Sequence, residues 1–143
     1  MRTTVLFPLL IAALGVGTWT YMQRANADTV TAPASGVTTM VTVSVPDSFA
    51  PLAEMGKIAF DAKCAICHGE NAAGQKGVAP PLVHKIYEPS HHGDFSFERA
   101  AMLGVRAHHW PFGDMPPVEG LTKADIKSII AYIRALQREN GIS

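Results

Sequence analysis

The chain contains the run Cys64-Ala65-Ile66-Cys67-His68, which has the form C-x-x-C-H. This spacing is the signature of haem attached covalently through two thioether bonds. On one helical turn, the two cysteines face the two vinyl groups of a porphyrin, and the next residue directs an imidazole at the iron. The run therefore predicts one haem c per chain, bound through Cys64 and Cys67, with His68 as the proximal iron ligand.

Two other uses of a cysteine pair fit this sequence less well. A dithiol oxidoreductase motif follows a strand in a βαβ unit, whereas this run follows an apolar helical stretch and continues directly into His68. A structural zinc site needs a second pair of ligands. The chain has only 2 cysteines, so His84, His91 or His92 would have to complete such a site. Haem attachment uses both cysteines, and no disulfide is expected.

The overall composition indicates one small domain without nucleic-acid-binding character. The chain has 143 residues, 48% of them hydrophobic, which is enough for a single compact core. Its 12 basic and 12 acidic residues balance, whereas nucleic-acid-binding domains are typically strongly basic. Nucleic acid is therefore not an expected partner.

The N-terminus has the features of an export signal. Arg2 precedes an uncharged, mostly apolar run over residues 5–22, and residues 25–27 read Ala-Asn-Ala, the small-x-small form of a signal peptidase site. The apolar run is also just long enough to span a bilayer. Residues 1–27 are therefore expected to be a signal peptide or an N-terminal membrane anchor. Either form predicts a location in the periplasm or on the extracytoplasmic face of the inner membrane.

Residues 28–46 have the composition of a flexible linker, rich in Thr, Val, Ala and Ser and almost without charge. Residues 40–45 alternate apolar and polar side chains, but a single strand has no partner here, so a loose extended segment is expected. The globular domain is expected to cover residues 47–143. Asp47 or Ser48 is the expected cap of its first helix.

Two amphipathic helices are predicted at the ends of this domain. The first leads into Cys64, and the second begins with a capping box at Thr122 and carries isoleucines at helical spacing. Gly56 interrupts the apolar face of the first helix, at a cost of about 0.5–1 kcal/mol relative to alanine. One explanation is that the helix simply tolerates this cost. Close approach of the second helix is the other, with the Tyr132 ring filling the space beside the glycine.

Together these motifs resemble a class I cytochrome c over about residues 47–140. The resemblance implies an all-α cytochrome c fold, in which N- and C-terminal helices cross over one covalently bound haem. The matching residues are Gly56, Phe60, Cys64, Cys67, His68 and Gly69, residues 77–82 (Gly-Val-Ala-Pro-Pro-Leu), residues 113–117 (Gly-Asp-Met-Pro-Pro), and Ala131, Tyr132, Ile133 and Leu136.

The same resemblance identifies Met115 as the distal iron ligand, because it stands in the Met-Pro-Pro context typical of the family. A thioether is a soft donor that favours ferrous iron, so ligation by His68 and Met115 would raise the reduction potential. The resemblance also implies that the Pro80 carbonyl accepts the second N–H of the His68 imidazole, which fixes the tautomer.

Other side chains compete for the sixth iron position. Met55 lies on the first predicted helix and Met102 on another, expected over residues 97–104, where a methionine more often serves core packing. His108 and His109 are the main alternatives, and ligation by two histidines would lower the potential. Adjacent histidines in a loop are more often surface residues.

Histidines are unusually dense between residues 84 and 109, which departs from the family's minimal pattern. One interpretation is a second metal site, with copper or zinc bound by His91, His92 and one other histidine. The expected interpretation is a polar loop insert whose histidines titrate independently. The other histidine of such a metal site would be His84, His108 or His109.

Trp110 and Tyr87 carry hydrogen-bond donors able to reach a buried haem propionate, or else they form the wall of the haem pocket.

The predicted function is electron transfer rather than enzymatic catalysis, because an iron with both axial positions filled has no place for a substrate. The expected partners are other redox proteins or respiratory complexes, which dock through small, transient surfaces. Two alternatives stay open. One is a haem-bearing subunit of a membrane oxidoreductase complex, attached through residues 5–22. The other is a haem sensor or enzyme with an open sixth iron position.

Overall fold

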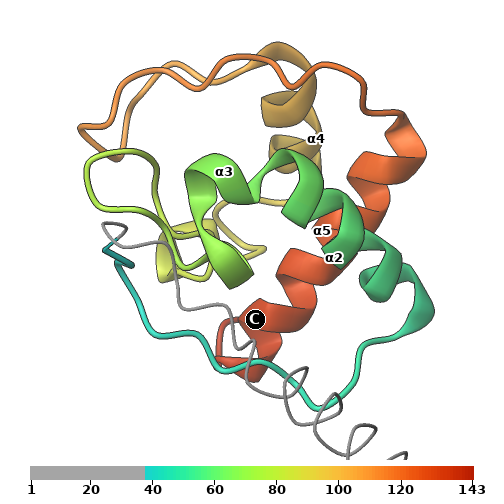
Figure 1. Ribbon diagram of the computed structural model, residues 1–143. Helices are drawn as coiled ribbons and strands as arrows, with labels where there is room; N and C mark the ends of the chain where they lie inside the picture. Colours follow the sequence, from blue (N-terminus) through green and yellow to red (C-terminus); the bar gives the residue numbers. More distant parts are fainter. Residues whose placement is uncertain (1–37) are drawn as a thin grey trace, which may run out of the picture. The chain divides into compact units, whose positions relative to one another are not determined.

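The structure, a computed structural model, describes residues 38–143, and the regular elements in this range are all helical (Figure 1). Between residues 38 and 143 there is no strand, and pairing of extended segments is limited to isolated bridges. The all-α expectation is therefore confirmed. In chain order the elements are α2 (Pro51–Lys63), α3 (Ala65–His68), the 3₁₀ turns η1 (Glu70–Ala72) and η2 (Lys85–Tyr87), α4 (Asp94–Leu103) and α5 (Lys123–Glu139).

Helices α2 and α5 pack directly against each other, and Gly56 lies at their contact (Figure 1). A Cβ atom at this position would overlap the carbonyl oxygen of Ser128 on α5. The expected close approach of the second helix is therefore present. The expectation that the Tyr132 ring fills the space beside Gly56 is wrong, because the backbone of α5 at Ser128 occupies it.

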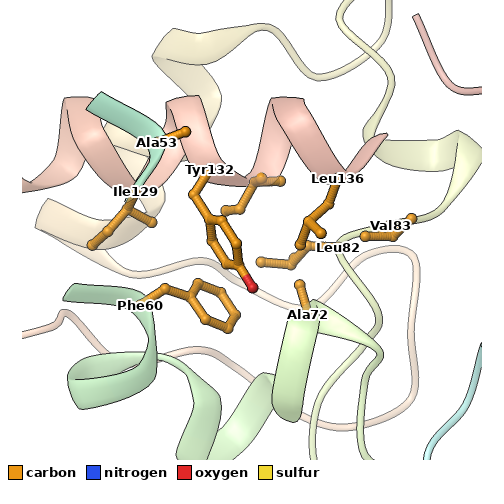
Figure 2. Packing of buried hydrophobic residues seen from close by; sticks show 9 residues of the cluster. Ala53, Phe60, Ala72, Leu82, Val83, Ile129, Tyr132 and Leu136 are labelled. Atoms are coloured by element: carbon orange, nitrogen blue, oxygen red, sulfur yellow. The ribbon is translucent and has the colours of Figure 1, made fainter. Parts of the chain in front are cut away.

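Tyr132 instead lies at the centre of the core, where it is fully buried (Figure 2). Its ring contacts Phe60 and Phe49, with centroids 5.5 Å and 5.2 Å away. Its hydroxyl donates to Oδ1 of Asn71, at 3.0 Å. Burial raises the pKa of Tyr132 well above its ordinary value, so the hydroxyl remains a donor. The buried cluster comprises Ala53, Phe60, Ala72, Leu82, Val83, Ile129, Tyr132, Ile133 and Leu136.

The two long helices begin differently. The predicted capping box of α5 is confirmed: the Thr122 hydroxyl accepts from the backbone N–H of Asp125, and the Asp125 carboxylate accepts from that of Thr122. The expected cap of α2 at Asp47 or Ser48 is wrong. Its N-cap is Ala50, directly before Pro51. Proline suits the first helical position because its φ is preset and an N–H there would have no partner in the helix.

The domain begins earlier than residue 47. The backbone N–H groups of Met40 and Val41 donate to the Ala73 carbonyl, at 3.2 and 3.1 Å. Ser44 exchanges two backbone hydrogen bonds with the Asn140 side chain beyond α5. The described part of the expected linker is thus held against the domain, because its backbone groups form hydrogen bonds with residues distant along the chain. Residues 28–37 lie outside the described residues.

Helix α4 begins three residues before the predicted start at residue 97 and ends at Leu103. The expectation that Met102 packs in the core is wrong, since this residue is 46% exposed. The inner face of α4 is formed instead by Phe97, Ala100 and Ala101, which line the cavity described below.

A buried arginine on α5, which the sequence patterns did not indicate, organises the segment before α4. The Arg134 guanidinium donates to the backbone carbonyls of Tyr87 and His92, at 2.7 and 2.6 Å. It also donates to Asp94 at 2.8 Å and to the Gln137 amide oxygen at 2.6 Å. These hydrogen bonds fix the turn over residues 87–94 against α5.

Within residues 38–143, no helix is both long and apolar enough to cross a membrane. The expected leader, residues 1–27, lies outside the described residues.

The helix contact at Gly56 makes a testable prediction. Gly56→Ala is expected to lower the free energy of unfolding of the haem-loaded protein by about 2 kcal/mol, because the added Cβ pushes α2 away from the Ser128 carbonyl. Chemical denaturation measures this. The matched control is Ala62→Gly at an exposed position of the same helix, which is expected to cost about 1 kcal/mol through helix propensity alone. A stabilising Gly56→Ala substitution would contradict the contact.

Candidate functional site

The C-x-x-C-H run forms a helical turn at the end of α2. The backbone N–H groups of Cys67 and His68 both donate to the Cys64 carbonyl, at 3.1 and 2.9 Å. Cys64 is half-buried, Cys67 exposed and His68 buried, and neither cysteine is in a disulfide. Burial, and secondarily the nearby Cys67, raise the pKa of Cys64 to about 11. The three side chains line one cavity.

Gln75 holds this turn in place, and the sequence patterns did not indicate it. Its side-chain amide donates to the carbonyls of Ala65 and Ile66, at 3.1 and 3.0 Å. These are carbonyls of α3, which is a single helical turn, and the Ala65 carbonyl also accepts from the backbone N–H of Gly69. A lone glutamine in a loop carries no sequence signal for this role, because the hydrogen bonds depend on the folded path of residues 69–79.

His68 is held by a hydrogen bond between its Nδ1 and the Pro80 carbonyl, at 2.9 Å. Burial lowers the pKa of His68, and the hydrogen bond to Pro80 opposes this more weakly. The imidazole is therefore neutral near pH 7. When the Nδ1–H group donates a hydrogen bond to the Pro80 carbonyl, the lone pair on Nε2 is free to bind a metal ion.

The cavity has a volume of about 270 Å³ and mostly apolar walls. Its walls come from the inner face of α4, from the isoleucines of α5 and from the loops on either side of α4. Ile126, Ile129 and Ile133 contribute from α5. An apolar cavity with a few convergent polar groups is the usual form of a cofactor site.

Met115 and His68 line the same cavity. Met115 is half-buried and pairs with Val105 through two backbone hydrogen bonds of 2.9 Å, which close the loop between them. Gly104 allows this pairing, because a Cβ there would contact the Met115 carbonyl oxygen. Met55 and Met102 are exposed and are not among the residues that line the cavity.

His108 and His109 also line the cavity, although both side chains are largely exposed. They lie in the loop between Val105 and Met115. The structure therefore brings the expected distal ligand and its two alternatives to the same wall.

Trp110, in the same loop, carries a buried polar group without a partner. Its indole N–H is buried and has no hydrogen-bond partner of good geometry among residues 38–143. Tyr87 also lines the cavity; burial raises the pKa of Tyr87, and the nearby Trp110 indole N–H opposes this rise. A buried donor without a partner is costly unless a ligand satisfies it. Such a donor in this cavity fits the propionate of a haem.

The residues present fit a haem c group in their chemistry. The cavity walls combine two thiols, a neutral imidazole and a thioether, which are the attachment and axial groups of covalently bound haem. The remaining lining is apolar, as a porphyrin face requires.

The histidines between residues 84 and 109 do not form an independent polar insert, contrary to the expectation. One ring nitrogen each of His91, His92 and His109 lies within 4.8 Å of the others. Partial desolvation of its ring, followed by the charges of the neighbouring histidines His108, His92 and His91, lowers the pKa of His109. His84 lies apart from this group and packs its ring against Trp110.

Comparison with known proteins agrees with this geometry. The sequence model of the family described as Cytochrome c matches residues 53–137. Among similar proteins are the Cbb3-type cytochrome c oxidase subunits CcoP of Cereibacter sphaeroides and Azospirillum brasilense. The first is 34% identical over 96 residues, 66% of this chain and 31% of that subunit. The second is 38% identical over 93 residues, 61% of this chain and 29% of that subunit. The match thus spans under a third of each relative's length.

The indole N–H of Trp110 leads to a testable prediction. Trp110→Phe is expected to lower the free energy of unfolding of the haem-loaded protein by about 1–3 kcal/mol, because a buried propionate then loses a donor. Chemical denaturation measures this. Phe112→Leu is the control, since it disturbs the ring stacked on the indole and removes no donor. If Trp110→Phe were neutral or stabilising, the N–H would have no acceptor in the loaded protein.

Proposed function

This chain belongs to the cytochrome c family, so it carries covalently bound haem c and transfers electrons, and we propose that it works as a carrier between redox partners on the extracytoplasmic side of the membrane. The observation that carries the proposal is the single cavity lined by Cys64, Cys67, His68 and Met115. A filled axial pair leaves the iron no position for a substrate, which is why we infer a carrier rather than an enzyme.

In this proposal Cys64 and Cys67 form the two thioether bonds, and His68 and Met115 are the axial ligands. Haem c supplies one-electron cycling between ferric and ferrous iron. The burial of His68 keeps its imidazole neutral, and the Pro80 carbonyl accepts a hydrogen bond from Nδ1, so that Nε2 would bind the iron. The thioether of Met115 stabilises the ferrous state, which raises the reduction potential.

The surroundings of these ligands favour rapid electron transfer. Met115 is fixed through its paired backbone with Val105, and Gln75 and Pro80 hold the turn that carries His68. Ligands that are held in place move little when the charge on the iron changes, so the reorganisation energy of electron transfer stays small. The walls around the site are mostly apolar.

An exposed apolar rim beside the motif suits short-lived contacts with partners. Ile66 is 80% exposed and Val78 is 50% exposed, and the loop residue Gln75 hydrogen-bonds both segments. Val78 and the exposed Cys67 also line the cavity. We infer that electrons enter and leave here, since weak redox encounters use small surfaces.

A second candidate function is that of a haem-bearing subunit in a respiratory oxidase complex. The similarity to two oxidase subunits favours it. The carrier and the subunit use the same haem site and differ in whether the protein stays bound to its partner. Purification in mild detergent separates them, because a subunit co-purifies with other membrane proteins and a carrier does not.

The distal ligand is tested by Met115→Ala in the purified haem-loaded protein. The midpoint potential is expected to fall by roughly 0.2 V, since axial ligands tune haem over about 0.8 V. The ferrous form is expected to bind carbon monoxide, because a ligand position opens. Spectroelectrochemistry and a carbon monoxide titration measure both effects.

The matched control is Met102→Ala, which removes a methionine that is 46% exposed and outside the cavity lining. It is expected to leave spectrum and potential unchanged. A low-spin spectrum and unaltered potential in Met115→Ala would instead assign the sixth position to His108 or His109, which His108→Gln and His109→Gln then distinguish.

The proposed location is tested by cell fractionation. Because residues 1–27 have the form of a signal peptide or membrane anchor, haem-stained protein is expected in the periplasmic or inner-membrane fraction. N-terminal sequencing of the same sample distinguishes the two forms, since cleavage leaves a new N-terminus close to Asp28. Recovery of the holoprotein in the cytoplasmic fraction would refute export.

A further inference from the structure

Two segments on either side of α4 bring three imidazoles together. His91 and His92 lie in the turn before the helix, and His109 lies in the loop after it. The three ring nitrogens lie within 4.8 Å of one another, and the rings pack edge to face or tilted, with centroids 4.6–5.4 Å apart. Three histidines that converge from two segments are the pattern of a transition-metal site.

One pair of nitrogens already has the separation of metal ligands. Nε2 of His91 and Nε2 of His109 are 3.5 Å apart. Zinc binds imidazole nitrogen at about 2.0–2.1 Å with tetrahedral geometry, which places two ligand nitrogens roughly 3.4 Å apart. The third nitrogen, on His92, needs only a small adjustment of its side chain to join them.

His92 is oriented as metal-binding histidines usually are. Its Nδ1 donates to the Ile86 carbonyl at 2.6 Å, which leaves the lone pair on Nε2. The neighbouring His108 has the same arrangement with the Arg106 carbonyl, at 2.8 Å. A backbone carbonyl that fixes the tautomer also raises the basicity of the other nitrogen and so strengthens its bond to a metal ion.

The backbone around the cluster is fixed before any ion binds. The buried Arg134 donates to the His92 carbonyl, which holds the first segment against α5. In the second segment, the Asp114 carboxylate accepts from the backbone N–H of Ala107, and the pair of Val105 with Met115 closes the loop. Because the backbone is already ordered, little conformational entropy is lost when an ion binds.

We propose that His91, His92 and His109 bind one divalent transition-metal ion of the class that imidazole prefers, zinc or copper, with solvent completing its coordination. The ion ties the turn before α4 to the loop that carries Met115. The proposed ligands differ from the expected haem ligands, but the site adjoins the haem cavity: His92 and His109 belong to the cavity lining, and His91 does not.

The experiment uses untagged, haem-loaded protein from which loosely bound metal has been removed by a chelator. Zn²⁺ is added in competition with a chromogenic zinc indicator, and elemental analysis gives the ratio of zinc to iron. One zinc per iron is expected. His91→Gln and His109→Gln are each expected to weaken Zn²⁺ binding by more than about tenfold, since even outer partners of metal ligands contribute 10–100-fold.

The matched control is His84→Gln, because His84 is a nearby histidine outside the cluster whose Nδ1 accepts a hydrogen bond from the Ile86 N–H. It is expected to retain the zinc affinity of the unaltered protein. The visible haem spectrum of each variant is recorded with the titration, and His91→Gln is expected to leave it unchanged.

Three results would overturn the proposal. The first is absence of binding at one equivalent. The second is equal weakening by His84→Gln and His91→Gln, which would indicate scattered surface binding. The third is loss of the low-spin spectrum in His109→Gln, because that nitrogen would then belong to the haem iron.

Discussion

The close contact between the backbones of α2 and α5 determines where the haem motif can lie. Gly56 lets α2 approach the Ser128 carbonyl, at a position where any side chain would separate the helices. Cys64 ends α2, and the isoleucines of α5 form one wall of the cavity. The distance between the attachment turn and that wall therefore depends on a single missing Cβ atom. A core close-packed around Tyr132 then fixes the orientation of both helices.

Hydrogen bonds from polar side chains of α5 and of the loops hold the segments around the cavity in place, in addition to the packing of the two helices. Tyr132 reaches Asn71 just after the motif, Gln75 holds the motif's own carbonyls, and Arg134 fixes the turn before α4. Each bond joins residues from different segments of the chain. Buried donors and acceptors of this kind are costly when unpaired, so each one favours a single arrangement of its loop. The cavity is consequently shaped by hydrogen bonds as much as by apolar contact.

Features encoded locally were predictable from the sequence, and features that depend on distant segments were not. The C-x-x-C-H turn and the capping box at Thr122 each need only a few neighbouring residues, and both were found. The exposure of Met102 depends on which face of α4 meets the cavity, which the short apolar pattern left undecided. The grouping of His91 with His109 depends on two loops meeting across a helix.

We propose that His68 and Met115 are the axial ligands of the haem iron. Iron K-edge X-ray absorption of the reduced holoprotein tests this ligand pair, because the fine structure distinguishes sulfur from nitrogen neighbours. Ligation by His68 and Met115 predicts one sulfur neighbour together with nitrogen ligands from the porphyrin and one imidazole. An iron surrounded by nitrogen alone, whether five- or six-coordinate, would contradict it.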